Sequence, residues 1–561
     1  FKIFFAKVLN DAEAKDVEAD LKDKDLTCFV RLGTDFDENY YEYELPMDVT
    51  PWGTNFSQDT EIWPSANEMV IDLDRLTSLK KQRDAQVLLG VTTTLAIFSD
   101  TTNGDHQISI KGNPNLAGMK VIMIGVRNPK AAFNTLWTDD GEEKCAEIWV
   151  NELRLTDFKQ NGGWASTAKV SAQLADFGNV SVAGNYSTPG WGSIEKKVSD
   201  RQREYKKGFD FTSNFEMGQF FGRKVGISVP LYLGYSVNAI DPEYDLLAPD
   251  IKLKEYDVVD RKSKIANSRD LTVRRSFNVT NIRKSRKAGK TVRVWDVENF
   301  ALTYSYNELY RRDINTEEDR TKTYRGGLNY AFSAKPVLIE PFKKVAFLKK
   351  SKWFKLIKDA NFYLGPKSLS FDNQLQRMYN VHQNRNALDT NFVFLPTYYK
   401  NFTWDRAYTL KYDFTKNLKF SFAANNQALV REPQGNIDKD AAVGSIGQQN
   451  SIKYNDILNK TFNPFMTRVK TDTIKLGGFT KNYGHNYDFS YKVPLNKLPL
   501  TDWISATAKL RSSYDWQRAP LSQVSYGNTI QNSRNFSVNG QFNMVTLYNK
   551  VGFFKKVNND R

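Results

Sequence analysis

The segment KVGISVPLYLGYSVNA, residues 224–239, alternates large apolar residues with small or polar ones over 13 positions, from Val225 to Val237. Successive side chains of a strand point to opposite sides, so the pattern predicts a strand with one apolar and one polar face. Strands of soluble proteins usually hold about 5 or 6 residues, whereas strands that cross a membrane as part of a barrel need about 9–11. We therefore predict that the apolar face contacts lipid through these residues: Val225, Ile227, Val229, Leu231 and Leu233.

Long alternating segments of the same kind recur through the rest of the chain after Gly163. Most reach the length of a membrane-crossing strand. The segments lie near 164–175, 179–188, 205–217, 225–238, 270–280, 300–310, 321–333, 368–380, 401–414, 418–430, 483–493, 503–516 and 533–544.

The connections between these segments also differ in length. Short turns such as 175–179 and 414–417 alternate with long polar loops such as 239–269 and 431–482. Bacterial outer-membrane barrels have short periplasmic turns and long outer loops. If residues 177–178 are periplasmic, most short turns share that side, although the long connections 281–299 and 334–367 fall there too.

The first 157 residues differ in pattern from the later segments, and their short strand-like stretches predict a β-sandwich-like domain. Short strands are expected at 26–35, 39–47, 107–113, 120–128 and 146–155, and a helix is expected at 70–84. We thus predict an all-β protein in two regions. Residues 1–157 form the sandwich-like domain, and residues 158–561 supply long antiparallel strands of a very large, partial transmembrane β-barrel with long loops.

Composition agrees with a membrane barrel and narrows the alternatives. No run of about 18 apolar residues is present, so no transmembrane helix is expected, and aromatic residues make up 13% of the chain. The net charge is +15, but the basic residues lie mostly between the predicted strands and accompany no recognisable nucleic-acid module. Solvated loops explain this charge best, and phosphate-bearing lipid beside them would also suit it.

Two local stretches admit two interpretations each. Residues 342–358, FKKVAFLKKSKWFKLIK, place Phe347, Phe354 and Ile357 among seven lysines, which suits an interfacial amphipathic helix and a solvated turn helix equally well. Residues 35–44, DFDENYYEYE, could bind a partner or a cation. The stronger interpretation is a polar loop that enters a strand with Tyr41 and Tyr43 pointing inward.

The sequence offers no catalytic constellation. Its three histidines, His106, His382 and His485, lie in separate segments, and no nucleophile elbow, metalloprotease, P-loop or CxxC motif occurs. We predict no enzymatic activity, no cofactor and no metal. The two cysteines, Cys28 and Cys145, would form one disulfide in an oxidising compartment, while two buried free thiols are at least as consistent with the sequence.

Several longer strings resemble a known family. They include FVRLGTDFDENYYEYELPM (29–47), IKGNPNLAGMKVIMIGVRNP (110–129), AEIWVNELRLTDF (146–158), LADFGNVSVAGNYSTPGWGSIE (174–195), KTYRGGLNY (322–330), LKYDFTKNLKFSFAANN (410–426) and YDWQRAP (514–520). With these strings, spread over nearly the whole chain, the sequence resembles the SprA/Sov family of type IX secretion translocons. Members of that family are far longer than 561 residues, so the chain is expected to be an internal piece.

The resemblance implies a function and partners. The family forms a very large outer-membrane barrel, linked to gliding motility, that exports folded proteins from the periplasm to the cell surface. The implied partners are a FadL-like shuttle barrel of the PorV type, a plug protein, cargo proteins with C-terminal signal domains, and outer-membrane lipid or lipopolysaccharide, with no nucleic acid. The parity of the connections further predicts that residues 1–157 lie outside the cell, where they could cap the pore.

Two other functional classes stay open at this level. An outer-membrane porin or nutrient transporter would also use long two-faced strands, but usually as a complete chain with a plug or constriction loops. A soluble β-sandwich carbohydrate-binding protein would match the first region, but the long strands would then have to form soluble sandwiches and the protein would behave without detergent.

Overall fold

A computed structural model describes the chain over residues 2–8, 22–50, 59–102, 104–129, 144, 146–157, 162–197, 200–222, 224–287, 289–349, 352–386, 392–430, 432, 435 and 478–559. Contacts divide the chain into two compact units. The first comprises residues 1–166, 187–206 and 240–269, and the second comprises 167–186, 207–239 and 270–561. The first unit thus contains two segments that come from far beyond residue 157.

The first unit is built on a five-stranded antiparallel sheet with the strand order β5-β6-β3-β2-β7. The other strands of this unit form a second sheet in the order β4-β1-β8. The bounds are β1 Lys2–Val8, β2 Thr27–Gly33, β3 Tyr40–Pro46, β4 Glu68–Val70, β5 Phe98–Thr102, β6 His106–Lys111, β7 Val121–Arg127 and β8 Glu147–Arg154. Five of these strands match predicted ones, whereas β1, β4 and β5 were not expected from the pattern.

Helix α2 (Leu73–Leu88) closes the core of this unit. Its side chains Leu76 and Leu79 are each 1% exposed and pack in one cluster with apolar residues of the five-stranded sheet. Met69 of β4 belongs to the same cluster, and Ile148 of β8 packs against it. The core of this unit therefore combines helix α2 with residues of both sheets. The inward position predicted for Tyr41 and Tyr43 is confirmed, since they are 0% and 3% exposed.

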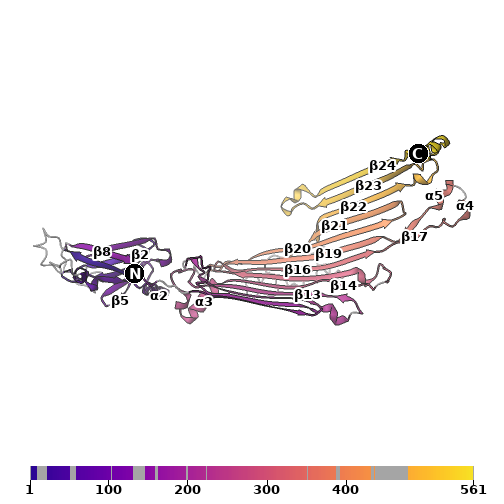
Figure 1. The fold of residues 1–561 in the computed structure, drawn as a ribbon. Coiled ribbons are helices and arrows are strands. Elements are labelled where there is room, and N and C mark those ends of the chain that lie inside the picture. Colours follow the sequence, from indigo (N-terminus) through magenta and orange to yellow (C-terminus); the bar gives the residue numbers. More distant parts are fainter. Residues whose placement is uncertain are drawn as a thin grey trace. The chain divides into compact units, whose positions relative to one another are not determined.

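The second unit is dominated by one 14-stranded sheet in the order β24-β23-β22-β21-β20-β19-β16-β15-β14-β13-β11-β10-β9, with β12 paired to β14 (Figure 1). Apart from β12, its strands hold from 10 to 18 residues, so the predicted antiparallel β fold is confirmed. Within the described residues, β9 and β24 are the edges of this path. The bounds are β9 Ala165–Leu174, β10 Gly178–Ser187, β11 Glu204–Glu216, β12 Ile227–Ser228, β13 Pro230–Pro242, β14 Asp270–Lys284, β15 Phe300–Arg312, β16 Thr316–Ser333, β19 Ser368–Asn384, β20 Thr397–Asp413, β21 Leu418–Leu429, β22 Phe479–Val493, β23 Ile504–Gln517 and β24 Thr529–Phe542.

Each predicted long strand overlaps a strand of this sheet, with one correction. The predicted strand 225–238 is divided into β12 and β13. Gly226 has φ +68°, a left-handed conformation that interrupts the extended chain. The backbone of Val229 then bonds away from the sheet ladder: its N–H donates to Glu216 Oε1 at 2.6 Å, and its carbonyl accepts from Met217 N at 3.0 Å.

Connections alternate between the two ends of the antiparallel sheet. Connections 175–177, 217–229, 285–299, 334–367, 414–417 and 494–503 share one end, and 188–203, 243–269, 313–315, 385–396, 430–478 and 518–528 share the other. We call these the turn end and the loop end. Connection 313–315 is a tight turn at the loop end, and 334–367 is a long excursion at the turn end.

The remaining elements are short. None of the helices among the described residues is long and apolar enough to cross a membrane. They are α1 Asp59–Ile62, α3 Val258–Ser268, α4 Ala346–Lys349, α5 Lys355–Lys358, α7 Met544–Tyr548 and α8 Gly552–Asn559. A small two-stranded sheet pairs β17 Val337–Ile339 with β18 Phe362–Leu364.

Candidate functional site

The large sheet has two faces of opposite character, which the register makes explicit. One row of directly paired residues crosses eight strands and contains only small or polar side chains. Since paired residues share a face, this row marks the polar face of the sheet. It runs Thr303, Gly327, Gln374, Asp405, Gln427, Asn482, Gln517 and Thr529.

Neighbouring side chains on the polar face bond to one another. Ser370 and Thr409 share a hydroxyl hydrogen bond of 2.5 Å, and Ser513 and Ser533 share one of 2.8 Å. Arg511 pairs with Asp488 at 2.7 Å across the strands. Hydroxyls, amides and locally balanced charges therefore line most of this face.

The opposite face is apolar and aromatic. A row on it, displaced from the polar row by an odd number of residues, runs Phe300, Tyr330, Phe371, Tyr408, Ala424, His485 and Tyr514. Rings on adjacent strands contact each other, with centroid distances of 4.9 Å for Phe300–Tyr330 and 5.1 Å for Phe371–Tyr408. Tyr408 is 38% exposed and Leu302, on the same face, is 49% exposed.

The apolar face carries charge near the loop end. Arg377 of β19 pairs with Glu432 at 2.5 Å, and their side chains are 5% and 2% exposed. Lys400 of β20 donates to the carbonyl of Gly435 at 2.7 Å. Glu432 and Gly435, which follow β21 in the chain, therefore lie over this part of the face.

The five residues predicted to face lipid occupy different settings. Leu231 and Leu233 lie in β13, half-buried, on the side where Tyr235 meets Phe209 with ring centroids 6.3 Å apart. Ile227 lies in β12 opposite Lys284, and Val229 lies in the break between the strands. Val225 precedes β12 in a turn and is 43% exposed, so it is not a strand residue. Contact with lipid stays a prediction for all five.

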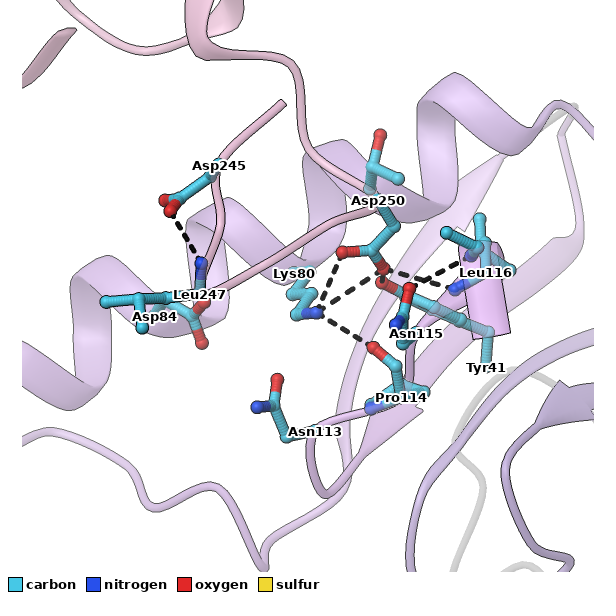
Figure 2. A network of polar contacts seen from close by, with 12 residues as sticks. Tyr41, Lys80, Asp84, Asn113, Pro114, Asn115, Leu116, Asp245, Leu247 and Asp250 are labelled. Atoms are coloured by element: carbon cyan, nitrogen blue, oxygen red, sulfur yellow. Dashed lines mark hydrogen bonds and ion pairs between the residues drawn. The ribbon is translucent and has the colours of Figure 1, made fainter. Parts of the chain in front are cut away.

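In the first unit, a buried polar network attaches segment 240–269 to the domain that precedes it (Figure 2). Lys80 of α2 donates to Asp250 Oδ1 at 3.0 Å and to the carbonyl of Pro114 at 2.8 Å. The Tyr41 hydroxyl donates to Asp250 Oδ2 at 2.8 Å. The side chains of Lys80 and Asp250 are 2% and 1% exposed. Burial, together with the neighbouring Asp250 carboxylate, raises the pKa of Tyr41.

Further ion pairs organise the same segment. Asp245 accepts from Lys264 at 2.6 Å and from the Tyr256 hydroxyl at 2.9 Å, which ties α3 to the preceding loop. Lys81 pairs with Glu255 at 3.2 Å, next to the Lys80 network. Sequence reasoning missed this attachment because 170 residues separate Lys80 from Asp250 and neither belongs to a motif.

A second polar cluster covers the other face of the five-stranded sheet. Glu42 pairs with Arg31 at 2.5 Å and with Arg127 at 3.1 Å, and Glu44 accepts from Thr27 at 2.5 Å and also pairs with Arg127. Burial raises the pKa of Glu44 above its ordinary value. The YEYE pattern thus divides in two, with tyrosines in the core and glutamates in this cluster.

Of the two cysteines that could form the predicted disulfide, only Cys28 lies among the described residues. Cys28 is buried, and its sulfur lies 3.3 Å from the carbonyl oxygen of Gly125, to which a thiol there would donate. Its pKa is raised, first by burial and then by Glu44. Cys145 lies outside the described residues, so the pairing stays a prediction.

The histidines do not converge. His106 Nδ1 lies 2.7 Å from the Tyr43 hydroxyl, His382 Nε2 lies 3.1 Å from Asn384 Oδ1, and His485 packs against Tyr514 on the apolar face. Over the described ranges, no three His, Cys, Asp or Glu side chains are placed to hold a metal ion.

These features define the class of protein: an antiparallel β-protein whose main sheet has strands of membrane-crossing length and two faces of opposite polarity. Residues 7–256 match the family described as motility related/secretion protein, SprA_N. This match supports assigning the chain to the SprA/Sov family that its sequence resembles.

No curated protein matches the chain. Among solved structures, the Copper transporter OprC matches with 9% identity and a TM-score of 0.19, covering 71% of this chain. The aligned part spans 61% of the length of that protein.

Proposed function

We propose that the chain forms part of the wall of a protein-conducting translocon of type IX secretion, which exports folded cargo across the outer membrane. One observation carries this proposal: a single sheet has an aromatic, apolar face on one side and a face lined by hydroxyls and amides on the other. The apolar face would contact lipid, and the polar face would line a wide aqueous pore.

In this proposal the protein catalyses no reaction and acts only as a conduit. Transport through a wide pore needs a wall to which cargo does not adhere, and the paired hydroxyls and amides of the polar face meet that need. We infer that selection of cargo lies in loops and partners. The proposed partners are a PorV-type shuttle barrel, a plug protein and exported proteins with C-terminal signal domains, as the family resemblance implies.

The orientation follows from the two ends of the sheet. We propose that the turn end faces the periplasm and the loop end faces outward, because outer-membrane barrels have short periplasmic turns. Strand β9 begins at the loop end, so residues 1–157 would lie outside the cell.

The test is fractionation of native membranes, gentle detergent extraction of the parent chain, and identification of what co-purifies. We expect the chain in the outer membrane together with a second barrel and exported proteins. A chain that fractionates as a soluble protein without detergent would contradict the proposal. A chain in the outer membrane that passes small solutes and retains no cargo would favour a porin or nutrient transporter instead.

A further inference from the structure

The excursion between β16 and β19 combines strong positive charge with exposed aromatic side chains. Residues 335–359 contain eight lysines and two carboxylates, Glu340 and Asp359. The excursion begins with β17, continues through α4 and α5, and returns as β18. It belongs to the same unit as the large sheet and lies at its turn end.

Both carboxylates of the excursion already have lysine partners. Glu340 accepts from Lys343 at 2.5 Å and from Lys416 at 2.6 Å, and these two bonds lower the pKa of Glu340 to about 2. Asp359 lies 3.6 Å from Lys497 Nζ. Two of these partners, Lys416 and Lys497, come from neighbouring connections, so both carboxylates have a partner outside the excursion.

Large apolar side chains stand exposed among the lysines. Phe347 is 65% exposed, Trp353 is 59% exposed and Ile357 is 49% exposed. Phe342 and Val345 are 44% and 41% exposed. Lys344 and Lys355 are exposed beside them. Lysines with Trp, Phe and Ile on one short segment are typical of chains that lie in the head-group region of a bilayer.

The excursion continues directly from the aromatic end of the apolar face. The Tyr412 hydroxyl donates to the Tyr363 carbonyl at 3.0 Å, and Tyr363 N donates to the Phe414 carbonyl at 3.1 Å. The rings of Tyr412 and Phe414 lie 4.7 Å apart, as do those of Phe420 and Phe489. Aromatic girdles of membrane barrels lie at the boundary between hydrocarbon and head groups. The lysines of the excursion come directly after these aromatic residues, at the level where lipid phosphates would lie.

We propose that residues 340–349 and 352–359 bind the head-group layer of an anionic phospholipid leaflet. Lys344, Lys355 and Lys358 pair with lipid phosphates, and Phe347, Trp353 and Ile357 insert among the acyl chains next to the head groups. This inference rests on the proposed function, because it requires lipid at the apolar face. A lysine near an anionic membrane surface contributes about 1 kcal/mol, which corresponds to roughly fivefold in partitioning.

The test uses the whole chain in nanodiscs made either of phosphatidylcholine or of phosphatidylcholine with one third phosphatidylglycerol. An environment-sensitive fluorophore is attached to W353C in a background with C28A and C145A. A second labelled protein carries N315C, at the loop end. We expect brighter, blue-shifted emission from position 353 in the anionic discs and no difference at position 315.

Charge reversal provides the matched comparison. The test variant is K344E/K355E/K358E, and the control is K411E/K419E/K509E, which makes the same charge change on the polar face. We expect the test variant to lose the anionic-lipid response, since three reversals remove at least about 100-fold in partitioning, and the control to keep it.

The outcomes separate this inference from the proposed function. If the chain enters both kinds of disc but position 353 responds equally in each, the inference is overturned, and an acidic protein becomes the partner that this charge suits. Retention of the response in the test variant overturns it as well. A chain that enters neither kind of disc would overturn the proposed function and this inference together.

Discussion

Lys80 of α2 donates to Asp250 at 3.0 Å in a site where both side chains are almost fully buried. The pair is the centre of the network that attaches segment 240–269 to the first domain. Removal of one partner of such a pair leaves a buried charge without compensation and typically costs about 3–5 kcal/mol. Substitution of Lys80 or Asp250 therefore tests directly how the first unit is held together.

We predict that Lys80→Met releases segment 240–269. Asp250 keeps its bonds from Tyr41 and Leu116 but loses its counter-charge. Trypsin cleavage in α3, at Arg261 or Lys262, should accelerate by roughly 100-fold, the equivalent of about 3 kcal/mol.

The control for this prediction is Lys24→Met. Lys24 pairs with Asp105, but the side chains are 54% and 59% exposed, and surface pairs contribute about 0–1 kcal/mol. Equal cleavage rates in both variants would contradict the role given to Lys80. The double variant Lys80→Met/Asp250→Leu should recover part of the protection, because apolar residues tolerate this burial.

We predict that the two faces of the sheet respond oppositely to charge. Leu328 and Asn329 are neighbours on β16 and point to the apolar and the polar face. Leu328→Arg should cost about 2–4 kcal/mol if lipid covers that face, and should reduce the folded protein recovered from outer membranes. Asn329→Arg lies opposite Asp372 and should leave the yield unchanged. Similar yields for both variants would argue against lipid at the apolar face.

We predict that reagents confined outside the cell reach the first domain. Lys120 is an exposed residue directly before β7, and a membrane-impermeant amine reagent should modify it in intact cells. Lys81 is a poorer reporter because it pairs with Glu255 and is 23% exposed. Modification of Lys120 only after the outer membrane is permeabilised would invert the proposed orientation.

We predict that Asp35 stabilises its loop only above acidic pH. Its carboxylate accepts from the Asn39 side chain and from the backbone N–H groups of Glu38 and Asn39, and these bonds lower its pKa to about 2 from an ordinary value of 3.8. Because the folded-state pKa is the lower one, the contribution is complete above about pH 4 and is lost as the pH falls toward 2. The difference in unfolding temperature between wild type and Asp35→Asn should shrink over that window, and a difference independent of pH would refute this account.

We predict that Cys28 does not react with a thiol reagent in the folded protein. The thiol is buried and its pKa is raised, so little thiolate forms at neutral pH. In unreduced, denatured protein, labelling of both Cys28 and Cys145 would exclude the disulfide. Labelling of neither would establish it.

Most of the long strands were predictable because the alternation that indicates a strand is a property of residues adjacent in the sequence. Alternation along β16 or β20 depends only on the strand's own residues, and each strand of the sheet overlaps a predicted segment. The break before β13 was missed because Gly226 adopts φ +68° and Glu216 captures the backbone of Val229. In the sequence, that glycine looks like any other small residue on the polar side of a strand.

The sequence by itself determined that the chain is an antiparallel β-protein with long two-faced strands, and its strings indicated the family. Only the tertiary structure decided which residues share a row across eight strands, that Glu432 lies over Arg377, and that Asp250 lies beside Lys80. The physical reason is distance along the chain. Alternation is a property of adjacent residues, whereas a buried ion pair depends on how the folded chain brings distant residues together.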